Sequence, residues 1–387
     1  MRIEEMLHRE NFYPILEKTL EQYYGEIIGT PCTVKVSDQK RGATALVYPK
    51  LNRIIKKRPA AAIVKNTYDG FNINDNLLKN ILAKIYVTAT LFSGGLLASK
   101  GLFLSQPSLL TSHHAIMPGN KKIRIADFER ELLDVIVKEG FRDDYFRNEL
   151  QFRLEHSDAF IVPILEHGEN WYREKMIQGT CLARMQDKMR YDAAVQTVLE
   201  CLKQISQKTE NLRAGSDYVS ELVLRIRQGL TQLQQEKTDL ETPLEAILPI
   251  VEKLAQAAGS LEQIPTMRSH GDMQSGNVLV EHSGKVYIID WETVAERSIW
   301  YDPATLLLFT RRLNRWTGIV RNRNEKKTKG ALLALDDDKN RNIDGVIAVL
   351  LLEDLDFRIT DARMVPGECG CSGLNGFVQE LKGVQDL

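Results

Sequence analysis

The stretches HGDMQSGNVLV (270–280) and IIDWE (288–292) are the most informative part of this chain. Together they form an H-x-D-x-x-x-x-N loop, a short apolar strand, a Ser-Gly turn and a second apolar strand that ends in an aspartate. The two strands are expected to pair as a hairpin. That pairing would bring Asp272, Asn277 and Asp290 to one end of the hairpin.

These three side chains match the needs of phosphoryl transfer. One carboxylate must orient the acceptor hydroxyl and take its proton, and Asp272 suits that role. A second carboxylate and an amide oxygen must hold the magnesium ions that bridge the nucleotide phosphates, and Asp290 and Asn277 suit those roles. The alternative is an aspartate-rich turn beside a hairpin. The strand–turn–strand–Asp context favours the functional interpretation.

The two stretches resemble the catalytic and metal-binding motifs of aminoglycoside phosphotransferases, choline kinases and their relatives. The resemblance covers about residues 111–312, and its most specific parts are the two motifs. It implies an α+β, two-lobed protein-kinase-like fold with a β-rich N-lobe and a mainly helical C-lobe. By it, Asp272 is the catalytic base and His270 braces the loop. Asp302, in the segment WYDP (300–303), is expected to be a structural acceptor for that loop.

The family also requires a lysine near a strand end and a helix glutamate that pairs with it. Lys138 ends the run LDVIVK, and Glu149 lies eleven residues further on in helix-like sequence. We expect Lys138 to contact the nucleotide phosphates and Glu149 to hold it in place. Lys121 and Lys122 are the rival phosphate contacts.

The nucleotide loop departs from the family pattern, because there is no G-x-G-x-x-G. The turn MPGNKK (117–122) stands where the phosphate-covering turn belongs. Gly119 and Asn120 are expected to take positive φ and direct backbone N–H groups at an anion. Met176, in a connector between the lobes, is expected to offer an apolar contact to adenine.

The remaining pattern predicts the domain organisation. Residues 1–110 are expected to be an N-terminal extension of unknown role, 111–177 the kinase-like N-lobe, and 178–387 the helical C-lobe with the catalytic loop. Within the extension, an amphipathic helix is expected over 11–28. The apolar stretch 85–104 is predicted to be a buried helix or a helix–turn–strand, with an interfacial anchor as the alternative.

Composition excludes several classes of protein. The 387 residues are 43% hydrophobic and 27% charged, which is typical of a globular protein with an ordinary core. The net charge of −1 provides no overall field toward nucleic acid or an anionic membrane, so any such binding requires a local patch. The N-terminus has no apolar signal-peptide region, and the five cysteines are few and scattered. We therefore expect a cytoplasmic protein with no nucleic-acid or membrane partner.

Two basic runs lie outside these motifs. Arg53–Arg58 is expected to be a solvated face. Arg311–Lys329 is either a solvated loop or a border of the acceptor site that favours an acidic or phosphorylated substrate. A polyamine acceptor would need acidic residues there, which disfavours an antibiotic substrate.

The sequence therefore predicts an ATP- and Mg²⁺-dependent phosphotransferase that acts on an alcohol group of a small molecule. Its oligomeric state and its acceptor are not determined by the sequence. One alternative is a pseudokinase-like scaffold or regulatory protein whose atypical turn does not hold ATP. The other is a protein kinase, which lacks support because no Asp-Phe-Gly…Ala-Pro-Glu segment follows Asp290.

Overall fold

A computed structural model describes residues 2–71, 77–365 and 370–384. The chain forms two compact units. The sheet unit comprises Met1–Phe146 and Val162–Gln178, and the helical unit comprises Arg147–Ile161 and Gly179–Leu387. The predicted α+β class, with one β-rich part and one mainly helical part, is confirmed.

The sheet unit is built on one nine-stranded antiparallel sheet with the order β1-β4-β2-β3-β5-β6-β7-β9-β8. Its strands are β1 (Val34–Ser37), β2 (Ala45–Tyr48), β3 (Arg53–Ile55), β4 (Lys100–Leu104), β5 (His114–Pro118), β6 (Lys122–Asp127), β7 (Leu132–Val137), β8 (Ile164–His167) and β9 (Trp171–Lys175).

Four of these strands lie in the first 110 residues, which were expected to form an N-terminal extension of unknown role. β3 pairs with β5 through Ile54 and Ile116, so the sheet continues across the expected boundary at residue 110. The physical reason is hydrogen bonding, because β5 has a second edge that β3 fills. Residues 1–110 are therefore part of the same sheet unit.

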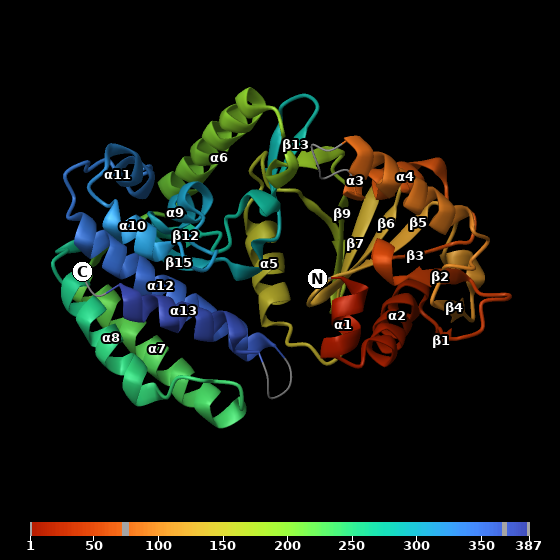
Figure 1. Ribbon diagram of the computed structural model, residues 1–387, viewed down its shortest axis with the longest axis horizontal. Helices are drawn as coiled ribbons and strands as arrows, with labels where there is room; N and C mark the ends of the chain where they lie inside the picture. Colours follow the sequence, from red (N-terminus) through yellow and green to blue (C-terminus); the bar gives the residue numbers. More distant parts are fainter. Residues whose placement is uncertain (1, 72–76, 366–369, 385–387) are drawn as a thin grey trace. The chain divides into compact units, whose positions relative to one another are not determined.

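Helices cover both faces of this sheet (Figure 1). They are α1 (Ile3–Arg9), α2 (Phe12–Ile28), α3 (Ala61–Phe71) and α4 (Leu77–Phe92), with short 3₁₀ turns η1 (Pro49–Leu51) and η2 (Pro107–Leu109). Successive side chains along β2 point to opposite faces of the sheet, which explains why the unit has two hydrophobic cores. Ala45 and Val47 pack in the cluster with α1 and α2, whereas Leu46 and Tyr48 pack in the cluster with α3 and α4. The predicted helix over 11–28 and the helix–turn–strand over 85–104 are both confirmed.

The helical unit surrounds α12 (Ile343–Met364), a helix with apolar side chains on nearly every side and therefore buried in the core. The other helices are α6 (Lys188–Thr209), α7 (Gly215–Glu236), α8 (Leu244–Ala258), α9 (Tyr301–Leu308), α10 (Trp316–Arg321), α11 (Lys326–Leu332) and α13 (Ser372–Gly383). α5 (Asp144–Glu155) begins in the sheet unit and continues in the helical unit. None of the described helices is both long and apolar enough to cross a membrane.

Two small antiparallel sheets complete the helical unit, with the orders β10-β13-β14 and β11-β12-β15. Their strands are β10 (Gly179–Cys181), β11 (Asn211–Ala214), β12 (Gln263–Ser269), β13 (Val278–Glu281), β14 (Val286–Ile288) and β15 (Ala295–Ser298). The 3₁₀ turns are η3 (Leu182–Arg184), η4 (Ser275–Asn277) and η5 (Trp291–Thr293). β13 and β14 form the predicted hairpin, with Val278 opposite Ile288.

Candidate active site

Buried polar groups hold the loop between β12 and η4 in place. The Asp302 carboxylate accepts the backbone N–H groups of His270 (2.6 Å) and Gly271 (2.9 Å), and Asp302 is fully buried. The His270 ring contacts the Ile289 carbonyl oxygen through Nε2 (2.9 Å), and its Nδ1 accepts the Asp272 N–H (3.2 Å). The interpretation of His270 and Asp302 as loop supports is therefore confirmed.

Gly271 is required by the geometry of this loop. Its φ is +83°, in the left-handed region that side chains rarely adopt. A Cβ at this position would lie 2.4 Å from the Thr293 carbonyl oxygen. The glycine in the H-G-D sequence thus lets the chain turn close to η5 and direct the next residue, Asp272, outward.

The Asp272 carboxylate is held in place yet remains 27% exposed. Oδ1 accepts Gln274 Nε2 (2.7 Å) and Arg311 Nε (3.3 Å), and Oδ2 accepts Asn277 Nδ2 (3.1 Å). A carboxylate that is oriented on both oxygens but reachable from solvent has the properties of a positioned proton acceptor.

Arg311 contacts the candidate base Asp272, a contact that the sequence analysis did not predict. It begins the basic run 311–329, but its side chain is largely buried and also donates to Asp354 (2.7 Å). Its guanidinium lies 3.3 Å from the centre of the Phe357 ring. Arg311 therefore joins the candidate base to the core helix α12. Nothing in the sequence pattern distinguishes Arg311 from its exposed neighbours Arg312 and Arg315.

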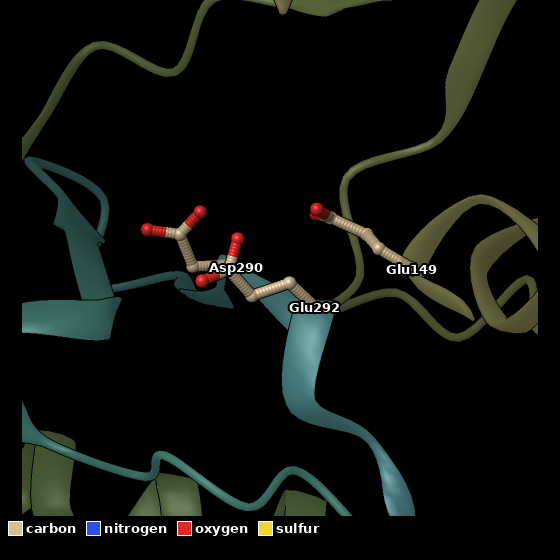
Figure 2. Close-up of side chains that lie close together, drawn as sticks. All are labelled: Glu149, Asp290 and Glu292. Atoms are coloured by element: carbon tan, nitrogen blue, oxygen red, sulfur yellow. The ribbon is translucent and has the colours of Figure 1, made fainter. Parts of the chain in front are cut away.

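Three carboxylates converge in the helical unit beside this loop (Figure 2). Asp290 follows β14 and has a φ of +62°, Glu292 lies in η5, and Glu149 reaches toward them from α5. One oxygen from each lies within 4.8 Å of the others. A left-handed aspartate is uncommon, and such strain is concentrated at functional positions.

Contacts from α5 explain why Glu149 reaches this cluster. The Asn148 side chain donates to the carbonyl oxygens of Val294 (2.6 Å) and Glu292 (3.2 Å). One turn later the Phe152 ring stacks on Trp291, with 4.7 Å between the ring centres. α5 is thus fixed against η5, which places the buried Glu149 beside Asp290. Glu149 also accepts Arg153 Nη1 (3.1 Å).

These donors fit a magnesium ion. Mg²⁺ takes hard oxygen ligands and is commonly bound through one or two carboxylates. Asp290 was predicted as a ligand, whereas Glu292 was not assigned and Glu149 was assigned to Lys138. Glu292 lies only two residues after Asp290 in IIDWE, and this closeness in sequence is the signal that could have identified it. Asn277 donates from Nδ2 to Asp272, so its contact with a metal, which stays a prediction, would be made through Oδ1.

Lys138 lies in the sheet unit, in a closed environment. Its ammonium donates to Glu10 Oε1 (2.6 Å) and to the Asn120 carbonyl oxygen (3.0 Å), and Met6 Sδ lies 3.0 Å away. The side chain is 0% exposed, and burial lowers the pKa of Lys138 to about 8. Glu149 belongs to the other unit, so the predicted Lys138–Glu149 pair stays a prediction.

The expected backbone conformation of the 117–122 turn is wrong. Neither Gly119 nor Asn120 has a positive φ, and the Gly119 N–H closes the turn by donating to the Lys122 carbonyl oxygen (2.8 Å). The Asn120 side chain and carbonyl oxygen both accept Arg9. The rival lysines are also engaged: the Lys121 ammonium lies 4.2 Å from the centre of the Tyr145 ring, and Lys122 is buried.

Met176 follows β9, two residues before the sheet unit ends at Gln178. Its N–H donates to the Glu131 carbonyl oxygen (2.8 Å), and its side chain is partly buried. This place in the chain agrees with a connector, and the adenine contact stays a prediction.

A protein-family model matches the part of the chain that carries the candidate base and the carboxylate cluster's Asp290 and Glu292. The family model described as "Phosphotransferase enzyme family" (APH) matches residues 167–327, which contain Asp272, Asn277 and Asp290. The predicted resemblance is confirmed. No curated protein sequence matches the chain.

Several solved structures of kinases are similar to this chain. An ethanolamine kinase from Plasmodium vivax has 13% identity and a TM-score of 0.48, with 83% of this chain and 93% of the other covered. The choline kinase LicA from Streptococcus pneumoniae has 13% identity and a TM-score of 0.45, with 72% and 91% covered. A thermostable mutant of the aminoglycoside phosphotransferase APH(4)-Ia has 13% identity and a TM-score of 0.46, with 71% and 95% covered. We base the proposed function on the site and on the family match.

Proposed function

We propose that this chain is a phosphotransferase that uses ATP and Mg²⁺ to phosphorylate a hydroxyl group of a small molecule. The observation that carries the proposal is the arrangement in the helical unit. A braced loop presents Asp272 and Asn277, and Asp290, Glu292 and Glu149 place oxygens within 4.8 Å of one another.

Asp272 acts on the acceptor. Its carboxylate orients the hydroxyl and accepts its proton as the new oxygen–phosphorus bond forms and the bond to the leaving nucleoside diphosphate breaks. Gln274, Asn277 and Arg311 hold the carboxylate, which reduces the reorientation needed before reaction.

Asp290 and Asn277, with Glu292 and Glu149 beside them, are the residues that would hold magnesium. When bound, this ion neutralises charge on the nucleotide phosphates. Arg153 donates to Glu149 and thereby fixes the direction of that carboxylate. In the sheet unit, Lys138 is proposed to contact the phosphates and Met176 to contact adenine. For Gly119 and Asn120 to contact the phosphates as well, their turn would have to exchange its hydrogen bonds to Lys122 and Arg9.

The first test is nucleotide binding. Calorimetric titration with Mg–ATP is expected to show binding, and a panel of hydroxyl-bearing metabolites is expected to contain one that stimulates ATP consumption. If Mg–ATP does not bind, the phosphotransferase proposal fails and a pseudokinase-like scaffold replaces it.

The second test addresses the base. Asp272→Asn keeps the shape of the side chain, so nucleotide binding is expected to persist while turnover falls by about 10²–10⁴-fold. Asp337→Asn, the same change on an exposed carboxylate of the helical unit, is the matched control and is expected to leave turnover unchanged. Near-normal turnover of Asp272→Asn would contradict the base assignment.

A further inference from the structure

The outward face of α4 is apolar. Ile81, Leu82, Ile85 and Phe92 are all exposed on this helix, Phe92 by 67%, and Leu96 and Leu97 extend the face into the following turn, Leu96 by 83%. These six residues are called the α4 apolar face. A shallow hollow of about 410 Å³ lies on it, lined by Ile81, Lys84, Ile85, Thr88 and Ala89.

The inward face of the same helix is apolar as well. Val87 and Leu91 are buried in the cluster that packs on β2 and β3. A helix that is apolar on both faces normally lies inside a protein or against an apolar surface. The inward face has its partner in the sheet, so the pattern indicates that the outward face has a binding partner of its own.

The part of the chain that contains this face is rich in positive charge. Residues 39–126 contain fourteen Lys and Arg against two Asp and no Glu, which the overall net charge of −1 conceals. Three of these lysines lie at or beside the face. Lys84 lines the hollow, the Lys57 side chain lies next to Gly94 in the turn after α4, and the Lys40 ammonium is 3.5 Å from the Leu96 carbonyl oxygen. The nearby Asp38 is paired with Lys100.

We propose that the α4 apolar face binds the surface of an anionic lipid bilayer. Aliphatic and aromatic side chains would enter the boundary between headgroups and acyl chains, and the lysines would contact lipid phosphates while their methylene stems pack on the apolar residues. The helix would lie along the interface. This revises the expectation of no membrane partner, which rested on the net charge of the whole chain.

Two other occupants fit the face less well. A second copy of the chain in a two-fold dimer would bring two sets of Lys40, Lys57 and Lys84 to one interface, and like charges repel. An acidic protein is compatible with the charge, and the experiment below distinguishes it because no such partner is present. The proposal is independent of the phosphotransferase function, since it needs neither nucleotide nor acceptor.

The experiment is co-sedimentation of the full chain with vesicles. We expect binding to phosphatidylcholine vesicles that contain about 30% phosphatidylserine, and at least about tenfold weaker binding to pure phosphatidylcholine. Ile85→Gln combined with Phe92→Gln is expected to weaken binding to the anionic vesicles by about tenfold or more, because two apolar side chains no longer enter the interface. Lys57→Gln combined with Lys84→Gln is expected to weaken binding and reduce its salt dependence.

The matched control is Ile27→Gln combined with Leu165→Gln, which changes two exposed apolar residues of the same unit outside the α4 apolar face. This control is expected to bind like the wild type, and thermal melting checks that all variants fold. Absence of binding to anionic vesicles, or binding that the Ile85/Phe92 variant does not reduce, would overturn the proposal. Dimerisation of the wild type in light scattering that the same variant abolishes would assign the face to a second copy and also overturn it.

Discussion

The charged groups around Lys138 in the sheet unit differ from those of the carboxylate cluster in the helical unit in how their charges are balanced. Lys138 is 0% exposed and pairs with Glu10, which is 6% exposed, so this cation already has a buried counter-charge. In the cluster, three groups of the same sign lie within 4.8 Å, and Asp290 and Glu292 are only partly buried. Like charges at that spacing repel and favour binding of a cation.

The comparison shows what the proposed nucleotide would have to change in each region. The carboxylate cluster would gain a metal ion between groups of like charge. The Lys138 ammonium would have to exchange Glu10 for a phosphate, which means displacing the start of the chain between Met6 and Glu10. Four predictions test this difference.

The largest expected effect is at Asp290. Asp290→Ala removes one carboxylate from the cluster, so we expect phosphotransfer to be lost and ATP binding to lose its dependence on magnesium. Calorimetric titrations with ATP alone and with Mg–ATP measure this dependence, and Asp337→Ala serves as the control. An unchanged magnesium effect in Asp290→Ala would show that this residue is not a ligand.

The second prediction concerns the partner of Lys138 during turnover. If Glu149 holds Lys138 in the active enzyme, Lys138→Ala and Glu149→Ala each reduce turnover more than nucleotide affinity, and the double variant is scarcely worse than Lys138→Ala. Steady-state kinetics of the wild type and the three variants provide the double-mutant cycle. Additive losses of turnover would reject the pair. A small loss in Lys138→Ala together with a large loss in Lys122→Ala would assign the phosphate contact to Lys122.

The third prediction concerns stability at the buried Lys138–Glu10 pair. Glu10→Ala leaves a buried ammonium without its carboxylate, so the free energy of unfolding is expected to fall by about 3–5 kcal/mol. Adding Lys138→Met to this variant should restore part of the loss. Urea unfolding measures both changes.

An exposed pair in the same unit provides the control for this prediction. Lys100 and Asp38 are 2.7 Å apart, close to the 2.6 Å of Lys138 and Glu10, but their side chains are 27% and 92% exposed. Asp38→Ala is expected to lower the free energy of unfolding far less than Glu10→Ala, since solvent screens the pair. Equal losses at the two pairs would mean that burial does not distinguish them.

The smallest expected effect is a pH dependence. Burial lowers the pKa of Lys138 to about 8 from its ordinary value of 10.5, so between these values the unfolded chain binds more protons than the folded chain. Stability conferred by this group therefore rises as the pH increases from about 8 toward 10.5. Urea midpoints of the wild type and Lys138→Met across this window measure the effect. Parallel curves for the two proteins would contradict the lowered pKa.

The local elements of the site were predictable because their residues are close in sequence. The β13–β14 hairpin, the loop that carries Asp272 and the helix that carries Glu149 depend on apolar spacing and turn residues within short windows. His270 and Asp302 were also assigned correctly as supports. The positive φ expected at Gly119 and Asn120 was wrong, because Gly and Asn permit a positive φ without requiring it. The Gly119 N–H instead donates to the Lys122 carbonyl oxygen.

By itself the sequence determined the phosphotransferase motifs and the α+β class. For residues 85–104 it left open a buried helix, a helix–turn–strand and an interfacial anchor. Only the tertiary structure decided which distant residues meet. Glu10 and Lys138 are 128 residues apart, and Asn148 binds a carbonyl oxygen 144 residues away, which brings Glu149 to Asp290. β3 likewise joins β5 across the expected domain boundary. Such contacts follow from the packing of complete faces of sheets and helices, and no pattern within one segment contains that information.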